Sequence, residues 1–454
     1  MRGGRSLLDH SGAAVNVRPP RILAATAAVL LVAPHCAPSA FAVGPPAVDN
    51  TMLPAPAPPA PPEPTEQREP CTIGLPAGGN QPRSGQLNGV DLPAMWRLTR
   101  GAGQRVAVID TGVQPHRRLP GVVAGGDYVS TGDGRQDCDG HGTIVAGIIA
   151  ATPDPADRTG FSGVAPEATI IAIRQSSNTF GPLSEPSSRG FGDVTTLAMA
   201  VRTAADMGAS VINISSVACT EGMLDDRILG AALSYAVDVK DAVVVAAAGN
   251  LGGSGQCPAQ NTTAQPTVIA SPAWYDDYVL TVASVAADGT PSPFSLNGPW
   301  VDVAAHGEDV VSLDRDGADT ITTMPGTSGP MPISGTSYAA PVVSGVVALV
   351  RARYPRMPAR QVMARIEATA HRPPRGRDSA VGSGVVDGRA ALSDQPAEPP
   401  SPRPATPPPV SGAPRRPAPA SGVVAAGAGL CLAGLVAAGS ARLRRRGRDD
   451  VPGN

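Results

Sequence analysis

The chain has 454 residues, a formal net charge of -2 and a pI of about 6.3, so its charge gives no reason to expect nucleic acid as a partner. Aromatic residues make up only 3%, while Gly (52) and Pro (50) are abundant. The length allows one large domain with appendages or two to three domains. The prolines are clustered, and their distribution indicates a large central domain flanked by non-globular segments.

The first 42 residues have the pattern of a secretory signal peptide. Arginines precede an apolar run, Ile22–Ala33, and Ala40-Phe41-Ala42 offers small residues for cleavage before Val43. An uncleaved membrane anchor is the alternative, but the run is shorter than the ~20 residues that a span needs. We therefore favour a cleaved signal and an exported protein.

Residues 43–86 form an N-terminal extension. Its first part, to about Glu69, is rich in Pro and Ala and is expected to be extended and mobile. The short polar part from Cys71 to Gln86 is too small for a core of its own, so it either floats or is tied to the next domain.

The main domain, residues 87–394, alternates continuous apolar runs with helical stretches. Because such strands are buried on both faces, we predict a doubly wound α/β fold with a mostly parallel sheet covered by helices. The expected strands are Arg105–Ile109, Thr169–Ile173, Val211–Ile214, Ala242–Ala247 and Tyr278–Val285; the expected helices are Asp91–Trp96, His141–Ala150, Val194–Met207, Arg227–Val237, about Ala339–Tyr354 and Pro358–Thr369.

The C-terminal residues predict a membrane anchor. Residues 395–420 read as a Pro-rich linker, and residues 421–441 are uncharged and long enough for one transmembrane helix. The arginine-rich residues 442–454 indicate a cytoplasmic tail. A buried helix of a soluble domain is the alternative, and the flanking tether and arginines disfavour it. We expect the main domain to lie outside the cell membrane.

Four cysteines remain when Cys36 in the signal and Cys431 in the span are set aside. An even number in an exported domain predicts disulfides, with three possible connectivities. We favour Cys71–Cys138, which would attach the extension to the domain, and Cys219–Cys257, which would join two loops. The spacing matches no zinc site and no calcium loop, so neither a metal nor a cofactor is predicted.

Three separated motifs predict catalytic chemistry. Asp110 follows the buried run Val106–Ile109, His141 stands between two glycines at a helix start, and Ser337 follows Gly335-Thr336 before a long apolar helix. A serine needs a base to remove its proton, and an acid can orient and stabilise the imidazole of that base. Ser337 alone could be a helix cap, but acid, base and nucleophile in this order match a known triad order.

Asn250 completes the predicted site. It follows Gly249 at the end of a buried strand, where its amide could donate a hydrogen bond to an oxyanion. The triplet Asp110-Thr111-Gly112 also occurs in aspartic proteases, but that mechanism needs a second carboxylate and the chain has no second Asp-Thr-Gly. The sequence therefore favours a serine peptidase.

These motifs resemble the subtilisin-like serine proteases over about Leu87–Leu392, and most closely the mycosins, membrane-anchored subtilases of type VII secretion systems. The stretches that carry the resemblance are Ala107–His116 (AVIDTGVQPH), Asp137–Thr143 (DCDGHGT), Gly163–Pro166 (GVAP), Ile171–Ser177 (IAIRQSS) and Ile333–Gly345.

The resemblance implies a subtilisin-like fold and gives catalytic roles to Asp110, His141 and Ser337 and an oxyanion role to Asn250. It also implies an extension that wraps the domain rather than acting as a removable inhibitor. The implied partners are protein or peptide substrates and the membrane components of a type VII secretion complex. Two functions stay open: an endopeptidase of exported proteins, and a structural cap of a secretion channel in which catalysis is secondary.

One stretch departs from the usual subtilase pattern. After Ser215, the family's Leu-Gly-Gly is replaced by Ser216-Val217-Ala218. With Ser215, Ser216, Val217 and Gly249 lining the substrate cleft, side chains in place of glycines would narrow the pocket for the residue before the scissile bond. We expect a preference for small residues there.

Overall fold

The computed structural model describes residues 44–394, except 77–84, 88, 158, 189, 253–256, 263–264, 318–319 and 327–328. The predicted signal peptide (1–42), linker (395–420), transmembrane helix (421–441) and tail (442–454) lie outside these residues. Within the described part of the chain, no helix combines the length and apolar character needed to cross a membrane.

The core of the domain is a parallel sheet of seven strands in the order β12-β11-β9-β7-β3-β5-β4. Its strands are β3 (Arg105–Asp110), β4 (Val123–Asp127), β5 (Thr169–Arg174), β7 (Val211–Ile214), β9 (Val243–Ala247), β11 (Val279–Val285) and β12 (Val303–His306). Every residue of β7, β9 and β11 is buried, as expected for strands covered on both faces. The predicted α/β fold with a mostly parallel sheet is confirmed.

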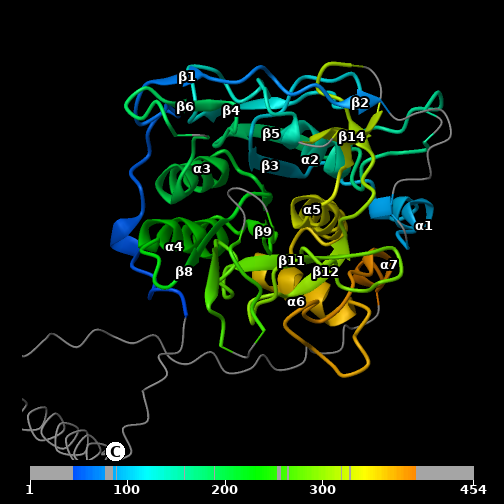
Figure 1. Cartoon of the computed structure of the whole chain (residues 1–454). Coiled ribbons are helices and arrows are strands. Elements are labelled where there is room, and N and C mark those ends of the chain that lie inside the picture. Colours follow the sequence, from blue (N-terminus) through cyan, green and yellow to red (C-terminus); the bar gives the residue numbers. More distant parts are fainter. Residues whose placement is uncertain are drawn as a thin grey trace, which may run out of the picture. The chain divides into compact units, whose positions relative to one another are not determined.

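Helices cover both faces of this sheet (Figure 1). α2 (His141–Ala150) and α5 (Thr336–Arg353) pack together on one face, and α3 (Val194–Asp206) packs with α4 (Arg227–Ser234) on the other. α4 continues into a π-helical turn, Tyr235–Val239. The remaining helices are η1 (Asn50–Met52), η2 (Gly85–Leu87), α1 (Leu92–Trp96), α6 (Ala359–Thr369) and α7 (Gly388–Ala391).

The strand order reverses around β3, and this positions the site. β5 lies on one side of β3 and β7 on the other, and each pairs with β3 in parallel. In such sheets a crevice opens at the carboxyl ends of the strands where the order reverses. Asp110 is the last residue of β3, and Ser215 directly follows β7.

Eight further strands form small antiparallel pairings that the sequence analysis did not predict. β1 pairs with β6, β8 with β10, and β14 with β2, β13 and β15. They are short, and several contain Gly or Pro, so most lack the continuous apolar pattern of the central strands; β10 is an exception, since all four of its residues are buried. Their bounds are β1 (Thr65–Gln67), β2 (Leu75–Pro76), β6 (Phe180–Pro182), β8 (Ala218–Glu221), β10 (Val268–Ser271), β13 (Ser312–Leu313), β14 (Thr320–Gly326) and β15 (Gly329–Pro332).

The N-terminal extension is extended, but the expectation of a mobile segment is wrong for its described part. Arg202 on α3 donates to the carbonyl of Pro54 at 2.9 Å, and η1 packs on α4. Further on, β1 adds to β6, a disulfide joins Cys71 to Cys138, and β2 adds to β14. A Pro-rich chain lacks periodicity of its own, so only these partners determine its path along the domain (Figure 1).

Candidate active site

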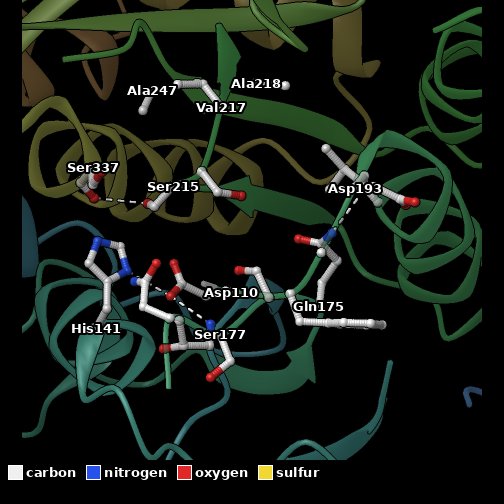
Figure 2. Close-up of a pocket in the computed structure, with 18 of the residues that line it drawn as sticks. Asp110, His141, Gln175, Ser177, Asp193, Ser215, Val217, Ala218, Ala247 and Ser337 are labelled. Atoms are coloured by element: carbon white, nitrogen blue, oxygen red, sulfur yellow. Dashed lines mark hydrogen bonds and ion pairs between the residues drawn. The ribbon is translucent and has the colours of Figure 1, made fainter. Parts of the chain in front are cut away.

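The end of β3 and the start of α2 bring an acid and an imidazole together. The Asp110 carboxylate is buried, and its Oδ1 accepts the backbone N–H of Thr111 at 2.7 Å. The same oxygen lies 2.7 Å from Nδ1 of His141, whose side chain keeps 27% of its surface exposed. The predicted acid and base are therefore in direct contact, and the imidazole remains open to the pocket (Figure 2).

Glycines allow α2 to begin this close to β3. Gly140, the residue before the helix, has φ 79°, a left-handed conformation that favours glycine. A Cβ on Gly142 would lie 1.9 Å from the carbonyl oxygen of Gly112, which leaves no room for any side chain. The two glycines that flank His141 in the sequence are thus required by the approach of the helix to the strand.

Asp137 is a buried group that the sequence analysis did not single out. Its carboxylate accepts hydrogen bonds from Thr111 Oγ1 (2.8 Å), Gly140 N (2.8 Å), Thr143 N (2.8 Å) and Thr143 Oγ1 (2.6 Å). Burial raises the pKa of Asp137 to about 6, against these donors, which favour the ionised form. The carboxylate joins the end of β3 to the first turn of α2 on either side of His141. In the sequence, Asp137 is the first residue of the stretch Asp137–Thr143 that contains the histidine.

The carboxylates around His141 control its charge. Burial lowers the pKa of His141, but the Asp110 carboxylate, with smaller contributions from Asp137 and Asp139, more than offsets this, so the pKa lies above its ordinary value. An imidazolium formed during a reaction is therefore stabilised where it stands.

Ser337 occupies the second position of α5, one residue inside the helix rather than in the turn expected before it. The hydroxyl of Ser215 donates to the main-chain carbonyl of Ser337 at 2.8 Å and so links β7 to this helix start. Within the described residues, the N–H of Ser337 has no acceptor, as is usual in the first turn of a helix. Figure 2 shows Ser337 and His141 at the same end of the pocket.

The carboxamide of Asn250 is held in one orientation by Thr336. Asn250 Oδ1 accepts Thr336 N at 2.9 Å and Thr336 Oγ1 at 3.0 Å, and the Thr336 hydroxyl in turn accepts the N–H of Gly249 at 3.2 Å. The Nδ2 donor of Asn250 has no acceptor in the described part of the chain. Asn250 and Ser337 both line the pocket, so each has an N–H group available there. Thr336 was missed as a functional residue, although it lies within the motif Gly335-Thr336-Ser337.

A pocket of about 590 Å³ is lined by Asp110, His141, Asn250, Thr336 and Ser337. The predicted cleft residues Ser215, Ser216, Val217 and Gly249 line it, as does Ala218. Val217, Ala218 and Ala247 lie together at the end of the pocket away from Asp110 (Figure 2). The remaining wall comes mainly from the segment after β5 and the loop before α3, with Ser176–Asn178, Ser188 and Gly190–Val194 among its residues.

Both disulfides lie beside the pocket, with the connectivity favoured from the sequence. Cys71–Cys138 ends three residues before His141. Cys219–Cys257 joins the strand after Val217 to the loop after Asn250. A Cβ on Gly249 would lie 2.8 Å from the Cys257 sulfur, so the second bridge packs directly behind the pocket wall. Among the described residues, no group of three or more His, Cys, Asp or Glu side chains could hold a metal ion.

A parallel sheet between helices, with a carboxylate, an imidazole and a serine at one pocket, defines a serine peptidase of the subtilisin type. The sequence profile of the subtilase family matches residues 101–384. The chain is 62% identical over 365 residues to Mycosin-4 of Mycobacterium tuberculosis (strain ATCC 25618 / H37Rv), covering 78% of this chain and 80% of that relative. This chain belongs to the subtilase family and, within it, to the mycosins.

Two solved structures are similar to this chain and support the family assignment. The structure of the MycP3 protease from the type VII (ESX-3) secretion system is 45% identical with a TM-score of 0.72, covering 78% of this chain and 100% of that one. A chain in the periplasmic assembly from the ESX-5 inner membrane complex is 40% identical with a TM-score of 0.73, covering 84% of this chain and 100% of that one.

Proposed function

We propose that this protein is a membrane-anchored serine endopeptidase that hydrolyses peptide bonds of exported proteins at the outer face of the cell membrane, in association with a type VII secretion system. The observation that carries the proposal is the 2.7 Å contact between Asp110 and His141 in the pocket that also contains Ser337 and Asn250. The signal peptide and the C-terminal helix predicted from the sequence support export and anchoring, with the tail in the cytoplasm.

In this mechanism Ser337 Oγ attacks the carbonyl carbon of the scissile bond while His141 removes its proton. Asp110 holds the imidazole through Nδ1 and stabilises the imidazolium. The N–H of Ser337 and Nδ2 of Asn250 stabilise the oxyanion. His141 then returns the proton to the leaving amine, which leaves an acyl-enzyme. Water, deprotonated by the same histidine, releases the acid product.

A fluorophosphonate probe tests the assembled triad. Incubated with the full-length chain, it is expected to add once to the wild type and not to Ser337→Ala, as measured by intact mass. Attack by Ser337 requires the neighbouring base and an open pocket, so a single adduct lost in the variant supports the proposed roles. A wild type that takes up no probe would contradict them.

A second function is favoured by a relative's place in the periplasmic assembly from the ESX-5 inner membrane complex. In this reading the subtilase domain is a structural cap of a secretion channel, and catalysis is secondary. An experiment in the producing cell distinguishes the two functions. If Ser337→Ala blocks secretion, catalysis is essential; if secretion persists in Ser337→Ala but stops on deletion of the protein, the structural role is distinct.

The raised pKa of His141 predicts the pH dependence. A general base must be neutral, so activity is lost as the pH falls through this pKa, and the acid limb should lie above the ordinary value of about 6.5. In Asp110→Asn the limb should move to lower pH because the main carboxylate that raises the pKa is gone. Probe inactivation rates between pH 4 and 9 measure both limbs. An Asp110→Asn limb that stays at the wild-type position would contradict this assignment.

The pocket wall predicts the residue preferred before the scissile bond. Val217 and Ala218 present side chains where glycines would leave space, so wild type should favour Ala, Ser or Gly. Val217→Gly should shift the preference toward larger residues by about 10-fold to 200-fold, the usual range for a small change in an apolar pocket. A peptide library cleaved by both forms provides the measurement. A wild type that prefers bulky aromatic residues would contradict the narrow pocket.

A further inference from the structure

Within residues 65–71, the N-terminal extension contacts two segments that flank the substrate pocket. β1 pairs with β6, the strand that precedes the loop 183–188 at the pocket. Cys71 is bonded to Cys138, three residues before the catalytic histidine. Figure 1 shows β1 lying along β6, above β4 and β5. The extension is therefore part of the architecture of the pocket as well as of the fold.

Arg68 is the only basic residue between positions 43 and 82, and its side chain is 16% exposed. Its guanidinium donates to four carbonyl oxygens of one loop, those of Pro182, Glu185 (2.9 Å), Pro186 (3.1 Å) and Ser188. Its backbone N–H also donates to Thr179 O at 2.8 Å. A planar, five-donor group can serve several acceptors in fixed directions, whereas an ammonium cannot.

The loop held by Arg68 continues directly into the rim of the pocket. Ser188 lines the pocket itself, and Gly190, Phe191 and Gly192 follow it there. Phe191 exchanges backbone hydrogen bonds with Ser177 on the opposite strand segment, at 2.8 and 3.0 Å. The start of the loop is also bound to the extension, because Leu183 N donates to Pro64 O at 2.9 Å and Ser184 Oγ donates to the Glu63 carboxylate. Arg68 holds the later part, Glu185–Ser188, which leads into the pocket.

We propose that Arg68 is a positioning residue for substrate recognition. By binding four carbonyls it fixes the Pro182–Ser188 loop and the rim that follows, so that the pocket accepts an extended polypeptide over several residues before the scissile bond. This inference rests on the proposed peptidase function. It gives the extension a specificity role: without Arg68 the catalytic groups remain, but the far part of the pocket loses its shape.

The test compares two active-site probes on the full-length chain. An alkyl fluorophosphonate needs only the triad and oxyanion donors, whereas a succinyl-Ala-Ala-Pro-Ala diphenyl phosphonate also occupies the distal pocket. In Arg68→Lys the inactivation rate with the peptidyl probe should fall by roughly tenfold to a hundredfold, since a misplacement of about 1 Å can have an effect of that size. The rate with the alkyl probe should stay within about twofold of wild type. Lysine retains the charge but cannot bind the four carbonyls together.

Two variants serve as controls. Arg202→Lys alters another arginine that binds the extension, at Pro54 O (2.9 Å), but that does not line the pocket, so both rates should match wild type. Gly181→Ala would place a Cβ 2.7 Å from the guanidinium carbon of Arg68 and should reproduce the selective loss while Arg68 is retained. This variant also serves if Arg68→Lys does not fold.

Two outcomes would overturn this inference alone. Equal losses with both probes would make Arg68 a residue of general stability. Unchanged rates in both Arg68→Lys and Gly181→Ala would show that the rim does not depend on it. A wild type that reacts with neither probe would overturn the proposed peptidase function as well.

Discussion

His141→Ala is expected to lower kcat by about 10⁶-fold, the size of loss found when the base of a comparable triad is removed. Ser337 then has no group to take its proton, because the Asp110 carboxylate faces Nδ1 of the imidazole, 2.7 Å away, and not the serine. The measurement is kcat on a peptide substrate selected from the cleavage library, with folding checked by thermal melting.

The double variant His141→Ala with Ser337→Ala controls this prediction. Residues that act as one unit are not additive, so the double variant should lose about as much as either single variant. A further large loss in the double variant would mean that Ser337 and His141 act independently. Retention of more than about one hundredth of wild-type kcat in His141→Ala would place the general base elsewhere.

Asn250→Ala is expected to lower kcat by about 10²-fold to 10³-fold, equivalent to about 2.7–4 kcal/mol of transition-state stabilisation. Thr336 fixes the Oδ1 side of this amide at 2.9 and 3.0 Å, so the Nδ2 donor is preorganised toward the pocket. Because the oxyanion forms only in the transition state, KM should change little. A raised KM with an unchanged kcat would make Asn250 a substrate-binding residue instead.

Asn261 is a matched control for Asn250. Its Nδ2 donates to Val268 O at 3.0 Å and Asn297 O at 2.8 Å, and its Oδ1 accepts Thr267 N and Val268 N. Both the donor and the acceptor of the Asn261 side-chain amide are thus paired inside the protein. Asn261→Ala should lower the melting temperature, since it leaves buried partners unpaired, while the kcat of the folded fraction stays near wild type. The two asparagines separate a catalytic amide from a structural one.

Local sequence patterns were sufficient to predict helices and strands whose bounds are determined by neighbouring residues in the chain. The run before Asp110 predicted β3, and the observed strand extends over it from Arg105 to Asp110. The helix that begins at His141 has the bounds expected from its small and branched residues. The antiparallel pairings were not predictable in this way, because strands such as Gly329–Pro332 are exposed and carry no alternation.

The sequence by itself determined the α/β class, five of the seven strands of the parallel sheet, and the order of acid, base and serine, because continuous apolar runs and glycine-flanked polar residues show in a few adjacent positions. Only the tertiary structure decided which residues orient that chemistry. Thr336 holds Asn250 across 86 positions, and Arg68 binds Pro182 across 114. It also placed the Pro-rich extension along the domain. Such contacts depend on where the chain returns after folding, and a hydrogen bond between distant segments leaves no periodic pattern in either of them.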